Sequence, residues 1–277
     1  MKTLRVIVVS LFGSFSAFAG SIFYSSDFSS TTGWSAQMNP SAGVGGTLQT
    51  STPFSVGTNS MGSYISATYY PTTLVNPASV ASSPSVWLGF LVRNESGLPW
   101  LTGVTVNSGT NNYEVQYHGP WLGQVGSESL KNGANKISFI NGNWNGVAGN
   151  SYTLLDGQAV AVLARFYDTG ATGNYNTGDL WVQSDLSQPL FSSVTSANAV
   201  VSGYFLGNVG VSTIRSLRLA GEGTGVQSFD NIVLADNSGD AIHFMSTGSV
   251  PEPSAFSLLA IGMGGWVALR RVRRKAD

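Results

Sequence analysis

The acidic residues of the chain lack the spacing of a glycoside hydrolase site. Such a site needs two carboxyl groups that face each other, about 5–5.5 Å apart in retaining enzymes and farther apart in inverting ones. Among the glutamates between residues 20 and 250, only Glu114 lies in a predicted strand, where a solvent-facing role is the simplest; the others are Glu95, Glu128 and Glu222. We predict no catalytic residue. A hydrolase that pairs Glu114 with an aspartate of a neighbouring strand is the last-ranked alternative.

The histidines and serines give no hydrolase motif either. A Ser/His/Asp site needs a histidine beside its nucleophile, and the chain has only His118 and His243. No serine occurs in a Gly-x-Ser-x-Gly turn. Two histidines so far apart in sequence also make no zinc motif. We expect His118 at a strand end and His243 in a linker.

Oxygen-rich loops could supply calcium ligands. Calcium takes six to eight oxygens from carboxylates, amides and carbonyls, and Asp236 and Asp240 flank an Asn-Ser-Gly sequence of this type. The loop from Asp168 to Asp179 is similar. The same residues are common in ordinary turns, so calcium is one of two interpretations, and no other cofactor is expected.

Two tryptophans lie where they could stack on a sugar ring. Trp121 follows His118-Gly119-Pro120, and Trp144 lies in an Asn/Gly-rich loop. The alternative is that both fold over a sheet edge, because tryptophan is usually largely buried. Trp87 and Trp181 lie inside predicted strands and are expected in the core.

The composition excludes several classes of protein. The chain has no cysteine, and thus no disulfide framework and no thiolate metal site. Between residues 20 and 250 there are six basic and twelve acidic residues, a net charge near −6, although the whole chain carries −1. An acidic body without a DNA-binding motif argues against nucleic acid as a partner.

The N-terminal residues have the features of a secretory signal. Lys2 and Arg5 precede an apolar stretch at Val6–Phe12, and Ala17-Phe18-Ala19 is a pattern that signal peptidase accepts. We expect residues 1–19 to be removed before Gly20. The alternative is an uncleaved membrane anchor.

The C-terminal residues have three parts in a fixed order. A Val250-Pro251-Glu252-Pro253 motif precedes Ser254–Leu269, which is 16 residues long and uncharged. As a helix it would reach about 24 Å at ~1.5 Å per residue, slightly less than a ~30 Å hydrocarbon core, a gap that bilayer thinning can close. A basic stop follows, which should stay in the cytoplasm: Arg270, Arg271, Arg273, Arg274 and Lys275.

This order resembles the PEP-CTERM sorting signal. The resemblance implies recognition and removal of the tail by an exosortase-type membrane enzyme, in a Gram-negative bacterium that makes exopolysaccharide. It covers residues 250–275 and implies export to the cell envelope, the cell surface or the extracellular matrix, with transient anchoring by the C-terminal helix.

Between these ends the pattern predicts an all-β fold. Short runs with period-two alternation recur between segments rich in Gly, Ser, Thr and Asn, which is typical of an antiparallel two-sheet sandwich or jelly roll. The predicted strands include Ser85–Val92, with both faces apolar, and Tyr113–His118. Others are Lys136–Ile140, Gln158–Tyr167, Asp179–Ser184, Thr213–Ala220 and Gln227–Leu234. We predict one domain over residues 20–235 and a linker over 236–249, in which Ile242-His243-Phe244 could form a last strand, followed by the tail at 250–277.

The strand order over residues 160–235 resembles laminin-G-like, concanavalin-type jelly rolls. It is carried by Ala161–Tyr167, Gly178–Val182, Ile214–Leu219 and Phe229-Asp230-Asn231-Ile232. Such folds often hold a calcium ion where the first and last strands meet, which here implies Asp27 and Asp230. The family includes lectins, glycan-binding modules and glycosidases, so the fold leaves the function open.

Three functions follow from these observations. The leading one is a non-catalytic protein of the cell surface or matrix that associates with exopolysaccharide. The second is a purely structural envelope component, and the third is the unrecognised hydrolase.

Overall fold

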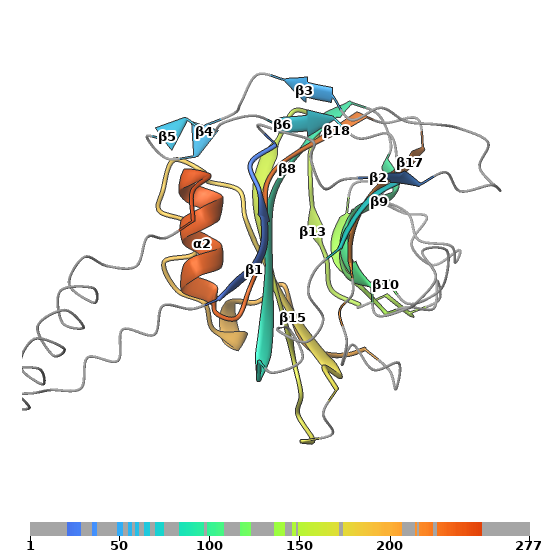
Figure 1. Ribbon diagram of the computed structural model, residues 1–277, viewed down its shortest axis with the longest axis vertical. Helices are drawn as coiled ribbons and strands as arrows, with labels where there is room; N and C mark the ends of the chain where they lie inside the picture. The colour runs from blue at the N-terminus through green and yellow to red at the C-terminus, as the bar shows by residue number, and fades with distance from the viewer. Residues whose placement is uncertain are drawn as a thin grey trace, which may run out of the picture. The chain divides into compact units, whose positions relative to one another are not determined.

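The computed structural model describes most of the chain between Ser21 and Val250 (Figure 1). The described residues are 21–28, 35–37, 49–51, 55–56, 59–60, 64–66, 70–74, 83–96, 99–107, 117–122, 136–141, 146–147, 149–171, 174–206, 214, 216–223 and 226–250. The predicted signal peptide and nearly all of the predicted tail therefore lie outside the described residues.

Two antiparallel sheets form the body. The first sheet has the order β16-β15-β14-β8-β18-β6-β3, with β1 also paired to β18. Its strands are β16 (Val201–Phe205), β15 (Thr177–Gln183), β14 (Ala159–Tyr167), β8 (Ser85–Ser96), β18 (Val226–Ala235), β6 (Tyr64–Ser66), β3 (Gln49–Ser51) and β1 (Ile22–Ser26).

The second sheet has the order β12-β11-β10-β9-β17-β7-β2, with β13 also paired to β11. Its strands are β12 (Gly146–Val147), β11 (Lys136–Asn141), β10 (Tyr117–Leu122), β9 (Pro99–Asn107), β17 (Ser216–Gly223), β7 (Tyr70–Leu74), β2 (Ser35–Gln37) and β13 (Tyr152–Thr153). A separate pair consists of β4 (Ser55–Val56) and β5 (Asn59–Ser60). The sequence-based expectation of an antiparallel two-sheet sandwich of the jelly-roll type is confirmed.

The main core lies between the sheets and follows the period of two. Alternate residues of β8 and β14 point into it, among them Phe90 and Phe166. Phe166 meets Phe139 of the second sheet edge-on, with the ring centroids 5.4 Å apart. Gly178 makes room for this pair, because a Cβ there would lie 2.6 Å from Cζ of Phe139.

A second apolar cluster covers the outer face of the first sheet. Leu91, Leu163 and Val233 point to this side, so β8, β14 and β18 are buried on both faces. The cover consists of residues 184–200, through Leu190 and Phe191, and a helix that follows β18. Figure 1 shows this helix beside β1, on the face of the first sheet that is turned away from β9 and β10.

The helix α2 (Ser238–Thr247) occupies the stretch that the sequence analysis treats as a linker or a last strand. Its start is set by Asn237, whose side chain accepts a hydrogen bond from the Asp240 backbone N–H at 2.9 Å. It ends at Gly248, which adopts the left-handed conformation with φ 68° and donates to the Phe244 carbonyl at 2.8 Å. The helix therefore has a defined cap at each end.

Tertiary packing holds α2 on the body. Phe244 and Met245 are buried against the first sheet, and the absence of a side chain at Gly89 lets Met245 approach β8. The Asn231 side chain donates to the Met245 carbonyl at 2.9 Å. Residues 236–249 thus belong to the folded body, which as a compact unit spans Ser21–Pro251.

Two further expectations can be compared with the described residues. The predicted strand Tyr113–His118 is observed from Tyr117 onward and continues through Trp121 to Leu122, so Trp121 lies within a strand. Among the described residues no helix has the length and apolar character needed to cross a membrane. The predicted membrane helix at 254–269 lies outside these residues.

Candidate functional site

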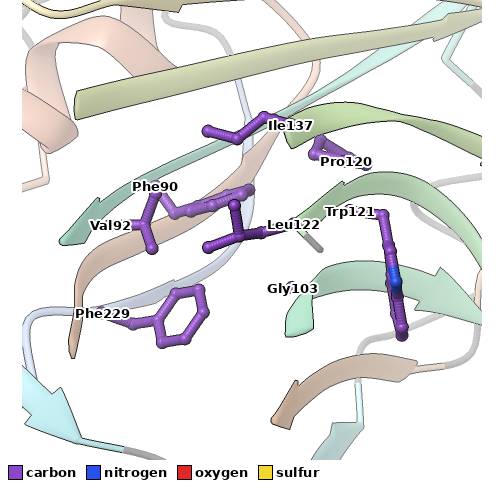
Figure 2. Close-up of a pocket in the computed structure, with 8 residues that line it drawn as sticks. All are labelled: Phe90, Val92, Gly103, Pro120, Trp121, Leu122, Ile137 and Phe229. Carbon is purple, nitrogen blue, oxygen red and sulfur yellow. The ribbon is translucent and has the colours of Figure 1, made fainter. Parts of the chain in front are cut away.

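A small cavity between the sheets is too apolar to be a ligand site. It has a volume of ≈ 10 Å³, about the space of one water molecule, and a water would need polar partners to stay there. Figure 2 shows Leu122 directed toward Phe90 and Phe229 across it. The other lining residues are Val92, Gly103, Pro120, Trp121 and Ile137.

Of the two predicted sugar-stacking residues, Trp121 is among the described residues. In Figure 2 the Trp121 ring lies beyond Gly103, away from Phe90 and Phe229. Its side chain is only 2 % exposed, and its Nε1–H has no hydrogen-bond partner among the described residues. This burial agrees with the alternative of folding over the sheet, although stacking on a sugar remains a prediction. Trp144 lies outside the described residues.

The two histidines lie in different environments. His118 on β10 is fully buried, and the loss of hydration lowers its pKa to about 4. It is therefore neutral at pH 7 and shielded from solvent. His243 is exposed on α2. Glu114, the candidate acid of the hydrolase alternative, lies outside the described residues.

The four aspartates that could bind calcium fall at opposite ends of α2. Asp236 and Asp240 lie at the helix start, where both accept hydrogen bonds from the Asn237 side chain, at 2.7 and 2.9 Å. Asp27 lies near the helix end, with its Cβ 3.7 Å from the place that a Cβ of Gly248 would take. A helix of 10 residues is about 15 Å long. The four residues therefore form two separate pairs.

The pair of Asp27 and Asp230 is the stronger candidate. Asp230 is fully buried; its Oδ1 accepts the Asn231 backbone N–H at 2.8 Å, whereas its Oδ2 has no hydrogen-bond partner among the described residues. Burial, and then the nearby charge of Asp27, raise the pKa of Asp230 to about 8, against the lowering effect of the Asn231 N–H. The carboxylate oxygens suit a hard cation such as calcium.

Two carboxylates alone do not complete a calcium site. The ion takes six to eight oxygens, and the described residues contain no group of three acidic or histidine side chains placed to hold a metal. Backbone carbonyls or water would have to supply the remainder. The carbonyl end of α2, which carries partial negative charge, ends beside Asp27 at Gly248. The residues present thus fit calcium only together with such further oxygens.

The structure also brings together a group that the sequence analysis did not single out. Arg165 of β14 lies directly opposite Trp87 of β8 on one side and Asp179 of β15 on the other. In the next row Tyr167 and Phe205 both lie opposite Thr177. We call this group the Arg165 patch, with the members Trp87, Arg165, Tyr167, Asp179 and Phe205.

The Arg165 side chain is held by aromatic rings. Its Cζ lies 4.3 Å from the ring centroid of Tyr167 and 5.5 Å from the ring of Trp87. The Trp87 ring in turn stacks on Trp181, with centroids 5.6 Å apart. The described residues offer Arg165 no carboxylate within 4 Å, and its Nε has no hydrogen-bond partner among them. The guanidinium is therefore positioned by stacking instead of an ion pair.

Asp179 is a buried carboxylate with one oxygen in use. Oδ1 accepts from the Gly203 backbone N–H at 2.7 Å and from the Tyr167 hydroxyl at 3.3 Å, whereas Oδ2 has no partner among the described residues. Burial raises the pKa of Tyr167, and Asp179 raises it further, so the tyrosine remains a donor at neutral pH. A spacing rule could not have found this group, because its members come from four strands and Trp87 of β8 is far from the others in sequence.

The last described residues lead directly into the predicted sorting motif. The Gly248 cap ends the helix, and Val250 is 53 % exposed. Pro251, Glu252, Pro253 and the basic stop lie outside the described residues.

Comparison with solved structures shows similarity of fold at low sequence identity. The globular domain of T. cruzi calreticulin is 12% identical, with a TM-score of 0.48, and the alignment covers 81% of this chain and 91% of that one. The cellulose-induced protein Cip1 is also 12% identical, with a TM-score of 0.47 and coverage of 77% and 97%. Peanut lectin is 9% identical, with a TM-score of 0.40 and coverage of 76% and 96%.

No curated protein matches the chain. One family model does: the PEP-CTERM protein-sorting motif matches residues 249–274. This match confirms the resemblance found in the sequence, and its first residue lies one position after the Gly248 cap. The C-terminal segment of this chain is a PEP-CTERM protein-sorting motif.

Proposed function

We propose that the protein is a non-catalytic surface or matrix protein of a Gram-negative bacterium that is exported, processed at its tail and bound to exopolysaccharide. The observation that carries this proposal is the direct succession of a folded body and a sorting motif. The last helix of the body, α2, ends at the Gly248 cap, and the sorting motif begins at residue 249.

The two processing sites fall at the edges of the folded body. Signal peptidase would cut before Gly20, and β1 begins at Ile22. An exosortase-type enzyme would act on the tail, which starts where α2 ends. Removal of both segments leaves the sandwich and its covering helix intact, which is what a protein with processing at both ends requires.

The chemistry of the described residues favours binding over catalysis. His118 is neutral and enclosed, so it is a poor general base. The aromatic rings and polar groups on the body instead suit the apolar faces and hydroxyls of sugars. If the mature protein is not retained by any polysaccharide, the structural envelope role takes its place.

Mass spectrometry of the protein released from the cell surface tests the export and sorting claims. We expect a mature form that begins at Gly20 and has lost residues from the Pro-Glu-Pro motif onward, because each cut lies outside the folded body. A cytosolic protein with both ends intact would contradict the proposal.

We further propose that Asp27 and Asp230 bind a structural calcium ion. The support is the buried Oδ2 of Asp230, the nearby charge of Asp27 and the carbonyl end of α2. Calcium would neutralise the two carboxylates and join the first strand to the last, while backbone or water oxygens complete the coordination.

This proposal predicts that the pH dependence of stability differs with and without calcium. When a chelator removes calcium, Asp230 is protonated in the folded protein over the pH range from its ordinary pKa near 4 to its raised pKa of about 8. Because the unfolded chain has released that proton, stability from this group falls as the pH rises through this range. Calcium binds the ionised carboxylate, so it should stabilise the protein more at pH 8 than at pH 5.

Urea unfolding at pH 5 and pH 8, with calcium or a chelator, measures this difference. The matched control is Asp230→Asn, which keeps the acceptor for the Asn231 N–H but does not titrate. It should lose the calcium effect and the contribution of residue 230 to the pH dependence. Equal stability of the unaltered protein with and without calcium at pH 8 would refute the site.

A further inference from the structure

We propose that the Arg165 patch is a binding site for a neutral polysaccharide. This inference rests on the proposed function and adds the site and the class of sugar.

The patch lies at the uncovered end of the outer face of the first sheet. Residues 184–200 and α2 bury the middle of this face, but Trp87, Arg165 and Tyr167 remain half-buried. Phe205 is 58 % exposed and lies on the same face as Tyr167, because both pair with Thr177. Aromatic side chains thus remain open to solvent at the end of an otherwise covered sheet.

Aromatic surfaces of this kind suit sugars. One face of a pyranose ring carries C–H groups and is apolar, so it packs on an aromatic ring and removes apolar area from water. Phe205 offers such a ring, and Tyr167 offers a second one in the same row. The guanidinium of Arg165 holds the Tyr167 ring in place from one side.

Polar groups beside the rings match sugar hydroxyls. Arg165 Nε is a donor without a partner among the described residues, and Asp179 Oδ2 is an acceptor without one. The two residues are direct ladder partners on the same face of the sheet, so a donor and an acceptor belong to one small area of the patch. Asp179 is held in position by its bond from Gly203. Arg165 Nε and Asp179 Oδ2 are both buried. The half-buried Arg165 side chain therefore has to shift before a sugar hydroxyl can reach these two atoms.

The charge balance favours a neutral ligand. Arg165 and Asp179 carry opposite charges, which leaves the centre of the patch without net charge. The chain between residues 20 and 250 has twelve acidic and only six basic residues, and this excess repels a polyanion. A neutral hexose polymer with free hydroxyls is not repelled by the acidic body and needs no charged partner in the patch.

Affinity electrophoresis of the mature protein in gels containing a soluble polysaccharide tests the inference. The probes are galactomannan and dextran as neutral polymers and alginate as an acidic one. We expect a neutral polymer to retard the protein and alginate to have no comparable effect. Arg165→Gln and Phe205→Ser should each weaken binding about fivefold or more, the effect of one lost hydrogen bond or ring contact.

Two control variants lie away from the patch, one near the far end of β8 and one in the loop before β14 that hydrogen-bonds to Asn94 there. Leu155→Ser removes a side chain that is 63 % exposed, as a match for Phe205. Arg93→Gln alters a half-buried arginine six residues along β8 from Trp87, about 20 Å away. Both should bind as the unaltered protein does, and thermal unfolding should show that all four variants remain folded.

The possible outcomes separate the two proposals. If no polysaccharide retards the unaltered protein, the proposed glycan binding fails, and this inference fails with it. If a neutral polymer retards the protein and the two patch variants equally, the function holds and the Arg165 patch is wrong as its site. Stronger binding of alginate, or a change in oligomeric state in the patch variants alone, would also overturn the inference.

Discussion

The outer face of the first sheet carries apolar side chains, as its inner face does, and these side chains have to be shielded from water. Leu91, Leu163 and Val233 would otherwise present an exposed hydrophobic surface. The chain provides the shield itself, from residues 184–200 and from α2. The stretch that follows the last strand is therefore structural, and the body is not finished at the end of β18.

This covering constrains where the functional features can lie. Because α2 runs back along the sheet to Gly248, its carbonyl end is brought beside Asp27 and next to Asn231. The sorting motif then starts directly from the helix end. At the other end of the sheet the cover stops, and the rows of Arg165 and Tyr167 remain partly open. Helix docking thus brings the carbonyl end of α2 to the aspartate pair and leaves the Arg165 patch outside the covered area.

The sheet architecture was predictable because it depends on a local pattern. Short runs of alternating or continuously apolar residues between Gly-, Ser-, Thr- and Asn-rich segments identified β8, β11, β14, β15, β17 and β18. The tail was equally predictable, since its three parts follow each other in sequence. The helix was missed, although Asn237 and Gly248 are typical caps and Ala241, Phe244 and Met245 have helical spacing. The Asp-Asn-Ser-Gly sequence at residues 236–239 is typical of a turn, and it favoured the prediction of a linker over that of a helix.

The sites were less predictable because they depend on pairing between distant strands. Arg165 reads as an interruption of an apolar strand, and only the ladders show that Trp87 and Asp179 flank it. The sequence-based prediction placed Trp121 after a strand, yet β10 continues through it and its ring is buried. For Asp27 and Asp230 the resemblance to jelly rolls indicated the pair, whereas the buried Oδ2 was visible only in the structure.

Hydrogen–deuterium exchange of the mature protein tests most directly whether α2 is part of the body. If the helix docks through Phe244, Met245 and the Asn231 hydrogen bond, the amides from Ala241 to Gly248 should be protected nearly as strongly as those of β18. Exchange of these amides at the rate of an unstructured peptide, while β18 stays protected, would show that this stretch is a tether after all.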